Sequence, residues 1–140
     1  MELVKNADGE VKVMVATNAF GLGVNIPDIR LVIHHSPSIG LDEYIQEAGR
    51  AGRDGRQAKA VLLWHPYDFT INRGLIEKAK LQLTGKQRKE RLAALDALQA
   101  YAQDEEHCRW RMVRKFFGEP KGDRCYDQCD NCFCRDEDWL

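Results

Sequence analysis

Long apolar segments are missing from this sequence of 140 residues. No apolar run reaches the ~20 residues that a membrane-spanning helix needs. The first ten residues, MELVKNADGE, are polar and lack the apolar core of a secretory signal. Both absences argue against a membrane or secreted protein, so we expect a nuclear or cytoplasmic location. With 44% hydrophobic and 31% charged residues, the composition indicates a soluble globular chain of one ordinary domain or two small ones.

Cysteine is absent from most of the chain and then appears five times in its last quarter. An odd number of thiols without a secretory signal argues against a framework of disulfides. The crowding of these thiols in one segment favours a metal site instead.

The net charge of -1 hides an uneven distribution of charged residues. Residues 50–91 carry 11 basic and 4 acidic side chains, whereas the segments on either side are acidic overall. A positive stretch is what a surface facing phosphates needs. The alternative is a solvated helical face, which charge alone favours.

The first half of the chain alternates apolar strands with helical or glycine-rich segments. Residues 11–16, 30–34 and 58–64 are short apolar runs, which predict buried strands. Residues 42–52 predict a helix with acidic residues in its first turn, ended or loosened by Gly49 and Gly52. This alternation indicates an α/β unit with a largely parallel sheet.

The second half of the chain is helical in character. Apolar spacing predicts a helix over 67–82, good helix formers predict another over 86–102, and a third is expected over 105–117. A cysteine-rich tail follows. We therefore expect a boundary after residue 66, with one unit over 1–66 and a second over 67–140.

Four thiols in the tail have a spacing typical of zinc ligands. The pattern is C-x16-C-x3-C-x2-C over Cys108, Cys125, Cys129 and Cys132. Zinc prefers four tetrahedral ligands, and a C-x2-C knuckle directs two thiolates at one ion. The segment CYDQCDNC has little to bury, so zinc would supply folding free energy. Cys134 could replace Cys132 and His107 could ligate beside Cys108, although both are poorer geometries, and free cysteines in a loop are the remaining alternative.

Residues 46–55, QEAGRAGRDG, place two arginines three residues apart among glycines. If the segment is helical, Arg50 and Arg53 lie on one face. The glycines leave space for a large anion, and two guanidinium groups suit a triphosphate and its transition-state charge. A glycine-rich turn with surface arginines is an equal alternative.

Taken together, these strings resemble the RecQ family of DNA helicases, which have two RecA-like lobes. ATNAFGLGVNIPDIR, VIHHSP and QEAGRAGRDG resemble the family's motifs V and VI, and LLWHPYD resembles its exit from the second lobe. CRWRMVRKFFGE and CYDQCDNC resemble its zinc-binding subdomain. The resemblance implies an α/β fold with a partial RecA-like parallel sheet, followed by a helical zinc-binding subdomain.

The resemblance also implies roles for individual residues. Arg53 matches the arginine finger that reaches ATP, Arg50 its companion near the γ-phosphate, and Gln46 the residue that opens the motif. Nucleotide contacts are implied for Gly21, Gly23 and Asn25, and a nucleic-acid contact for Thr17. The implied zinc ligands are Cys108, Cys125, Cys129 and Cys132, one ion per chain. The family often has x2 between the second and third cysteines, where this chain has x3.

Two motifs of a complete helicase are missing, the phosphate loop GxxxxGK[ST] and an acidic DExH-type magnesium site. Thr84-Gly85-Lys86-Gln87 and Asp104-Glu105-Glu106-His107 imitate them, but both are expected next to helices rather than after buried strands. We therefore expect ATP and Mg²⁺ to bind only in the full-length helicase and this chain alone to be inactive.

Three functions remain open at this point. The chain is either part of a 3′–5′ ATP-dependent DNA helicase that acts on single-stranded or forked DNA with a first lobe, or a stand-alone module that binds DNA or protein. The third possibility is a regulatory piece that pairs with itself or a helicase through an exposed sheet edge. No membrane partner is expected.

Overall fold

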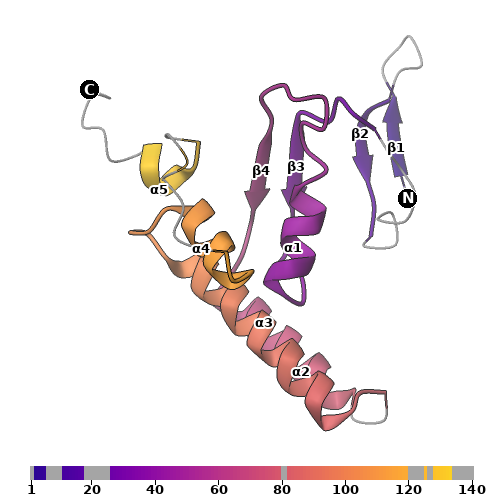
Figure 1. Cartoon of the computed structure of the whole chain (residues 1–140). Helices are drawn as coiled ribbons and strands as arrows, with labels where there is room; N and C mark the ends of the chain where they lie inside the picture. The colour runs from indigo at the N-terminus through magenta and orange to yellow at the C-terminus, as the bar shows by residue number, and fades with distance from the viewer. Residues whose placement is uncertain are drawn as a thin grey trace.

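The structure is a computed structural model, and it describes residues 2–5, 11–17, 26–79, 82–119, 125 and 128–133. Two small pairs of strands come first, and the helices then dominate the rest of the chain (Figure 1). None of the helices in these ranges is both long and apolar enough to cross a membrane.

A parallel strand pair forms the centre of the first half. β3 (Leu31–His34) pairs with β4 (Lys59–Leu62), and α1 (Leu41–Ala48) lies between them in the chain and packs against β3 (Figure 1). Parallel neighbours need such a crossover connection, and a helix usually supplies it. The predicted fold class is confirmed: a short parallel sheet is followed by a mostly helical region.

The first predicted strand has a different partner from the expected one. β2 (Val11–Val15) pairs antiparallel with β1 (Glu2–Lys5), which the sequence analysis missed, in a separate two-stranded sheet. The expectation that the predicted strands share one parallel sheet is therefore wrong for β2. The physical reason is proximity in the chain, because antiparallel strands can be joined by a short connection whereas parallel ones need a long crossover.

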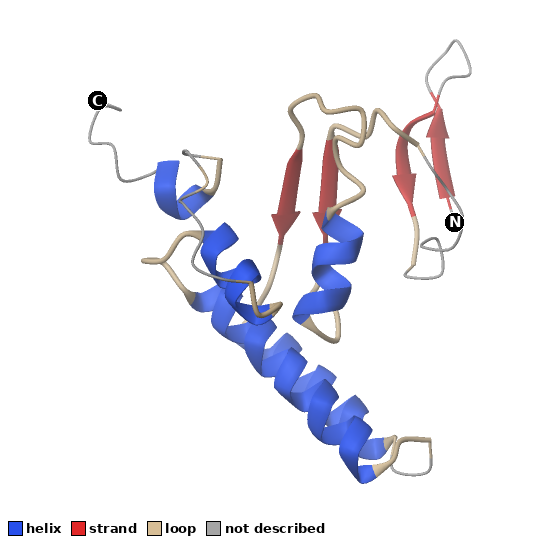
Figure 2. Ribbon diagram, in the orientation of Figure 1, coloured by secondary structure: helices blue, strands red, loops and turns tan. Residues whose placement is uncertain are grey.

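Two long helices lie side by side and form the body of the second half (Figure 2). α2 (Pro66–Lys78) begins after His65, whose side chain caps the helix, and α3 (Gly85–Gln103) begins after Thr84, which forms a capping box with Gln87. Capping satisfies backbone N–H groups that have no partner inside the helix. The string Thr84-Gly85-Lys86-Gln87 is thus a helix start between two helices, as the sequence predicted, and not a phosphate loop after a strand.

Two short helices complete the chain. α4 (Arg109–Phe116) follows a turn after α3, and α5 (Asp130–Phe133) is a single turn near the end of the described residues. The predicted helix over 105–117 therefore begins later than expected. The Asp104–His107 string forms the turn, because the carboxylate of Asp104 accepts hydrogen bonds from the backbone N–H groups of Glu106 (2.9 Å) and His107 (2.6 Å).

One hydrophobic core joins α1, α2 and α3. It consists of buried side chains from all three helices, namely Leu41, Tyr44, Phe69, Ile76, Leu95 and Leu98. Asn72 of α2 also donates from Nδ2 to the carbonyl oxygens of Pro37 (3.0 Å) and Ser38 (3.2 Å). The two parts of the chain therefore share a core across residue 66.

Candidate metal centre and arginine loop

Four thiols from three separate segments meet at one point. Cys108 is the residue before α4, Cys125 lies between α4 and α5 in the sequence, Cys129 directly precedes α5, and Cys132 lies within it. Their Sγ atoms all lie within 4.8 Å of one another. Cys108 is 6% exposed and Cys125 is 8% exposed. The structure thus brings together all four cysteines that the sequence analysis proposed.

The thiol cluster fits a tetrahedral zinc ion. With Zn–S bonds near ~2.3 Å, the sulfur atoms of a tetrahedral site are separated by ~3.8 Å. The observed spread of up to 4.8 Å needs only small side-chain movements to reach that geometry. Four thiolates would complete the coordination shell and leave no position for water, which is the pattern of a structural site. The donor set therefore suits a closed zinc centre.

The ionisation of these thiols reflects their mutual contact. Burial alone would raise the pKa of Cys108, but hydrogen bonds from the backbone at Arg111 and Cys125 and from neighbouring thiols lower it to about 6. Burial, and then hydrogen bonds with Cys129 and Cys108, raise the pKa of Cys125 and of Cys132. Ionisation of Cys108 is thus favoured, whereas ionisation of Cys125 and Cys132 is opposed. A bound divalent cation would overcome this opposition, because it binds every thiol as the thiolate.

A backbone turn shapes the knuckle that ends the cluster. The N–H of Cys132 donates to the carbonyl of Cys129 (3.1 Å), and the N–H of Gln128 donates to the carbonyl of Cys125 (3.3 Å). These two turns direct three thiols to the same side. The extra residue between the second and third cysteines is therefore compatible with the convergence of all four.

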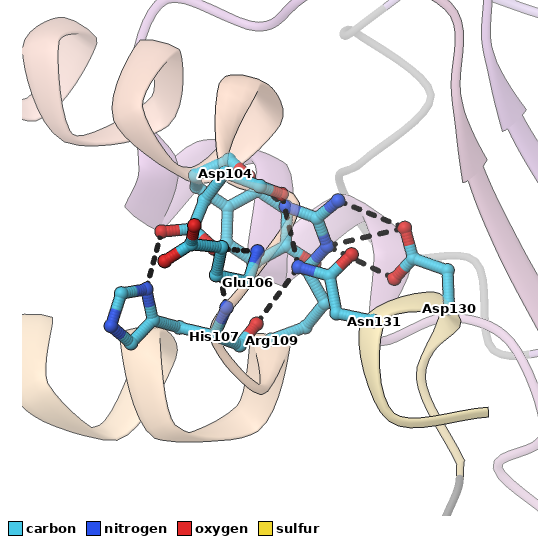
Figure 3. A network of polar contacts seen from close by, with 7 residues as sticks. Asp104, Glu106, His107, Arg109, Asp130 and Asn131 are labelled. Carbon is cyan, nitrogen blue, oxygen red and sulfur yellow. Dashed lines mark hydrogen bonds and ion pairs between the residues drawn. The ribbon is translucent and has the colours of Figure 1, made fainter. Parts of the chain in front are cut away.

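A polar network braces the segment before Cys108 (Figure 3). The Asp104 carboxylate accepts two backbone hydrogen bonds and also contacts Nδ1 of His107 (2.8 Å). The backbone N–H of His107 is the main reason that the pKa of Asp104 falls to about 2. His107, the alternative ligand, is therefore engaged with Asp104, and the thiol cluster does not include it. Cys134, the other alternative, lies outside the described residues.

Arg109 ties the knuckle to the end of α3. Its guanidinium donates to the carboxylate of Asp130 through Nε (2.9 Å) and NH2 (2.9 Å), and to the carbonyl oxygen of Tyr101 through NH1. It also lies over the Tyr101 ring, 5.1 Å from the centroid. The hydrogen bond from Arg109 is the main reason that the pKa of Asp130 is lowered. The segment after Cys108, the C-x2-C knuckle and the end of α3 are thereby held together.

Asn131 makes a second bridge of the same kind (Figure 3). It is only 9% exposed, and its Nδ2 donates to the carbonyl oxygens of Asp104 (2.9 Å) and His107 (2.8 Å). Arg109, Asp130 and Asn131 were not predicted from the sequence as site residues. The available signal was their position, because Asp130 and Asn131 are the two residues inside the C-x2-C knuckle and Arg109 follows the first thiol. Polar residues there orient ligands through a second layer of hydrogen bonds.

We expect Asn131→Ala to weaken zinc binding about 10–100-fold, since residues that orient metal ligands contribute on that scale. The reason is that the knuckle loses both hydrogen bonds to the segment before Cys108. Competition with a chromogenic chelator measures the affinity. Gln128→Ala is the matched control, because Gln128 is exposed and its hydrogen bond is made by the backbone. Equal affinity of the two variants would contradict a bracing role for Asn131.

The arginine motif continues into a loop rather than a helix; this loop, residues 49–56, is here called the arginine loop. α1 ends at Ala48, Gly49 caps it, and the residues that follow form successive turns. The helix expected over residues 42–52 ends at its cap, Gly49, one of the two glycines expected to end or loosen it, and the alternative of a glycine-rich turn applies to Arg50 and Arg53. The turn includes Gly52, which has φ of +67° and where a Cβ would lie 2.7 Å from the carbonyl oxygen of Arg56. A side chain at this position would be strained as well as crowded.

The arginine loop is pinned to the segment that leads into β3. The N–H of Gly52 donates to the carbonyl of Ile29 (2.9 Å), and the N–H of Asp54 donates to the carbonyl of Pro27 (3.0 Å). The Asp54 carboxylate pairs with Arg30, and this hydrogen bond is the main reason that its pKa is lowered. The backbone around Arg53 is therefore fixed from two sides.

The remaining predicted site residues have mixed positions. Arg53 and Gln46 are exposed, Arg50 is half-buried, and Thr17 is exposed after β2. Gly21, Gly23 and Asn25 lie outside the described residues. Arg50 and Arg53 both lie on the arginine loop, and Gln46 lies on the preceding helix.

Glu47 is a further residue that was not predicted from the sequence. Its Oε2 lies 2.8 Å from Nε2 of His34 and accepts a hydrogen bond from the Ser38 hydroxyl (2.7 Å). The end of α1 is thereby tied to β3 and to the turn after it. This contact holds the end of α1, where the arginine loop begins.

Comparison with known proteins gives the same order of parts. The sequence model of the family described as Helicase conserved C-terminal domain matches residues 1–55, and that described as RecQ zinc-binding matches residues 66–133. The second match and the four-cysteine cluster together support a zinc site.

Curated relatives align with most of the chain. ATP-dependent DNA helicase RecQ of Bacillus subtilis is 41% identical over 88% of this chain and 20% of the relative. ATP-dependent DNA helicase Q1 of Rattus norvegicus is 38% identical over 91% of this chain and 19% of the relative. A putative ATP-dependent RNA helicase of Acanthamoeba polyphaga mimivirus is 36% identical over 89% of this chain and 22% of the relative. The chain spans about a fifth of the length of these relatives. With both family regions matched in order, this chain belongs to the RecQ helicase family and comprises its helicase C-terminal region followed by its zinc-binding region.

Proposed function

We propose that this chain acts as the end of the second motor lobe and the zinc subdomain of an ATP-dependent 3′–5′ DNA helicase. The observation that carries the proposal is the arginine loop, whose backbone is held by Ile29 and Pro27 while Arg53 remains exposed. An exposed guanidinium on a fixed backbone suits an arginine finger, because its position costs little reorganisation during the reaction.

ATP and Mg²⁺ belong to the proposal only in the full-length helicase. The nucleotide would be held mainly by a first lobe, with Arg53 stabilising the charge that develops on the transferred phosphoryl group and Arg50 lying near the γ-phosphate. Gln46, Gly21, Gly23 and Asn25 are proposed as further nucleotide contacts, and Thr17 as a contact to the nucleic-acid backbone. Planar guanidinium groups suit this role because they donate two parallel hydrogen bonds to phosphate oxygens.

The zinc ligands in this proposal are Cys108, Cys125, Cys129 and Cys132, which hold one structural ion. The convergence of the four thiols and the bracing by Arg109 support this assignment. Zinc would supply the folding free energy that this small polar segment cannot obtain by burying apolar groups. The units proposed are 1–66 for the lobe and 67–140 for the zinc subdomain.

Exposed apolar side chains support a partner lobe or further chain beside the sheet. Leu31 and Ile33 project from β3 and are 51% and 56% exposed, and Val13 and Val15 of β2 are 54% and 58% exposed. Strands of a parallel sheet are normally covered on both faces. Self-association through this region is the less economical explanation, and we keep it with the stand-alone module as the second candidate function. DNA is the proposed partner, single-stranded or forked, in a nuclear or cytoplasmic location.

A chimaeric helicase tests the proposal. The aligned part of the Bacillus subtilis relative is replaced by this chain, and DNA-stimulated ATP hydrolysis and strand separation are measured. We expect both activities to be retained, while the isolated chain hydrolyses no ATP. A chimaera that folds, holds zinc and binds ATP but hydrolyses none would overturn the proposal, and self-association of the isolated chain would favour the second candidate.

A further inference from the structure

The end of α1 carries an acidic side chain in an unfavourable place. Glu47 lies in the last turn of this helix, and no basic residue occurs in that turn. The negative end of the helix dipole opposes a carboxylate there. Two donors compensate, because Oε2 of Glu47 lies 2.8 Å from Nε2 of His34 and accepts a hydrogen bond of 2.7 Å from the Ser38 hydroxyl. Loss of His34 would therefore release Glu47, which stands two residues before the arginine loop begins at Gly49.

The orientation of His34 depends on its packing. Its side chain is 11% exposed, and among the described residues its Nδ1 is buried without a hydrogen-bond partner. A single hydrogen bond leaves the ring free to rotate about that bond, so a neighbour has to fix the plane of the ring. Tyr44 does this, because the two rings meet edge to face with centroids 4.9 Å apart. Tyr44 is itself only 4% exposed and is held in the core.

Tyr44 also contacts the part of the chain that carries the metal knuckle. Its ring centroid lies 5.6 Å from that of Tyr101 in α3. Arg109 lies over the Tyr101 ring, 5.1 Å from the centroid, and pairs with Asp130 inside the C-x2-C knuckle (Figure 3). An unbroken series of contacts thus joins the knuckle to the end of α1. It is here called the contact line, and it consists of Asp130, Arg109, Tyr101, Tyr44, His34 and Glu47.

We propose that the contact line positions the arginine loop, so that His34 and Tyr44 are positioning residues for ATP hydrolysis that act through Glu47. The effect on ATP rests on the proposed function, whereas the effect on the loop rests on these contacts alone. An arginine finger contributes most when it is held in place before the reaction, because no reorganisation is then needed. A displaced end of α1 would move the backbone that carries Arg53.

The alternative is that the aromatic rings of the contact line serve only to fill the core. In that case any truncation in the core would loosen the arginine loop to the same degree. The contact line instead predicts an effect that is confined to its own members. The N–H groups of Gly52 and Asp54 are suitable reporters, because both make hydrogen bonds that hold the loop to the segment before β3.

Amide hydrogen exchange of Gly52 and Asp54 in the zinc-loaded chain, followed by NMR, tests the position of the loop without ATP. We expect His34→Ala to increase exchange at both amides about ten-fold, because local opening exposes protected N–H groups. Glu47→Ala should have the same effect. Glu47→Gln should keep exchange slow, since its amide oxygen still accepts hydrogen bonds. Further along the contact line, Tyr101→Leu should increase exchange and Tyr101→Phe, which retains the ring, should not.

Removal of zinc by a chelator tests the far end of the contact line. The knuckle then no longer holds Arg109 over Tyr101, so exchange at Gly52 and Asp54 should increase as it does in Tyr101→Leu. Ile76→Ala is the matched control, because Ile76 is 3% exposed in the same core and does not belong to the contact line. It should lower the melting temperature and leave exchange by local opening at both amides unchanged.

Two results of the exchange experiment would overturn the proposal. One is unchanged exchange in His34→Ala or in the metal-free chain. The other is an equal increase in Ile76→Ala, because the rings would then be ordinary core. Circular dichroism checks that each variant is folded, and zinc content is measured for every zinc-loaded sample.

The chimaeric helicase tests the consequence for ATP. His34→Ala should lower kcat about 10–100-fold with little change in KM, since a misplacement of about 1 Å can cost about 10²-fold in rate. Glu47→Gln should recover most of the rate that Glu47→Ala loses. An inactive parent chimaera whose loop exchange responds as expected would overturn the proposed function and support the contact line. An active chimaera in which His34→Ala changes neither exchange nor kcat would overturn the contact line alone.

Discussion

Removing zinc is expected to unfold the region from α4 to α5 while α2 and α3 stay folded. The reason is an uneven distribution of buried apolar groups. α4 contains no buried residue, whereas the shared core of α1, α2 and α3 includes Leu95 and Leu98, which are fully buried. The zinc region is thus held by its thiols and by a few hydrogen bonds. In zinc-finger peptides, structural zinc contributes about 10–16 kcal/mol of apparent binding free energy, far more than those bonds supply.

Hydrogen exchange with and without a strong chelator measures this prediction region by region. We expect the backbone of α4 to lose its protection and that of α3 to keep it. Cys132→Ser should reproduce the effect without chelator, since it removes one ligand of a closed site. Cys134→Ser is the matched control, because the C-x4-C spacing of Cys134 with Cys129 is the poorer knuckle and Cys134 is expected not to be a ligand. Full protection of α4 in the metal-free chain would show that the thiols are not a zinc site.

The secondary structure of the central and helical parts was largely predictable from local pattern. The apolar runs predict β3 and β4, apolar periodicity predicts α2, and good helix formers predict α3. The partner of β2 was not predictable, because strand pairing depends on which segments meet in space and not on the strand's own residues. The apolar pattern of β2 therefore did not reveal that β2 pairs antiparallel with β1.

The metal-ligating cysteines were predictable from the sequence, whereas the residues that position the two candidate sites through hydrogen bonds were not. The spacing of the four cysteines predicts convergence on one ion, since thiolates are the groups that zinc prefers. The roles of Arg109, Asn131 and Glu47 depend on contacts between segments far apart in the chain. Such contacts leave no periodic signal. The sequence left open whether Arg50 and Arg53 lie on a helix or in a glycine-rich turn, because a glycine in helical spacing does not reveal whether its φ is positive.

The predicted boundary after residue 66 lies at the start of α2 but does not divide the hydrophobic core. Composition changes there, and α2 begins there after His65. The core nevertheless crosses it, since Leu41 and Tyr44 of α1 pack with Phe69 of α2. Because the residues on both sides of this boundary share a core, we expect them to move together rather than independently. The helical body therefore supports α1, whose end leads directly into the arginine loop.

In the chimaeric helicase, Arg53→Ala is expected to lower ATP hydrolysis by about 10³–10⁵-fold, which is the contribution of arginine fingers to phosphoryl transfer. ATP affinity and melting temperature should change little, because the proposed role is confined to the transition state and Arg53 is exposed. Arg53→Lys should recover only part of the rate, since an ammonium group cannot donate two parallel hydrogen bonds. Steady-state and single-turnover kinetics separate the chemical step from binding and product release.

Arg56→Ala is the matched control for this prediction. Arg56 lies three residues further along the same loop, its side chain is 83% exposed, and its contact with Asp54 is 4.0 Å long. It should keep nearly full activity. Arg30→Ala is informative in a different way, because it removes the partner of Asp54 and should reduce the rate through loss of loop position. If Arg53→Ala and Arg56→Ala had the same small effect while Arg30→Ala destabilised the chain, the loop would be a structural turn with surface arginines, and ATP would have to be contacted by other residues.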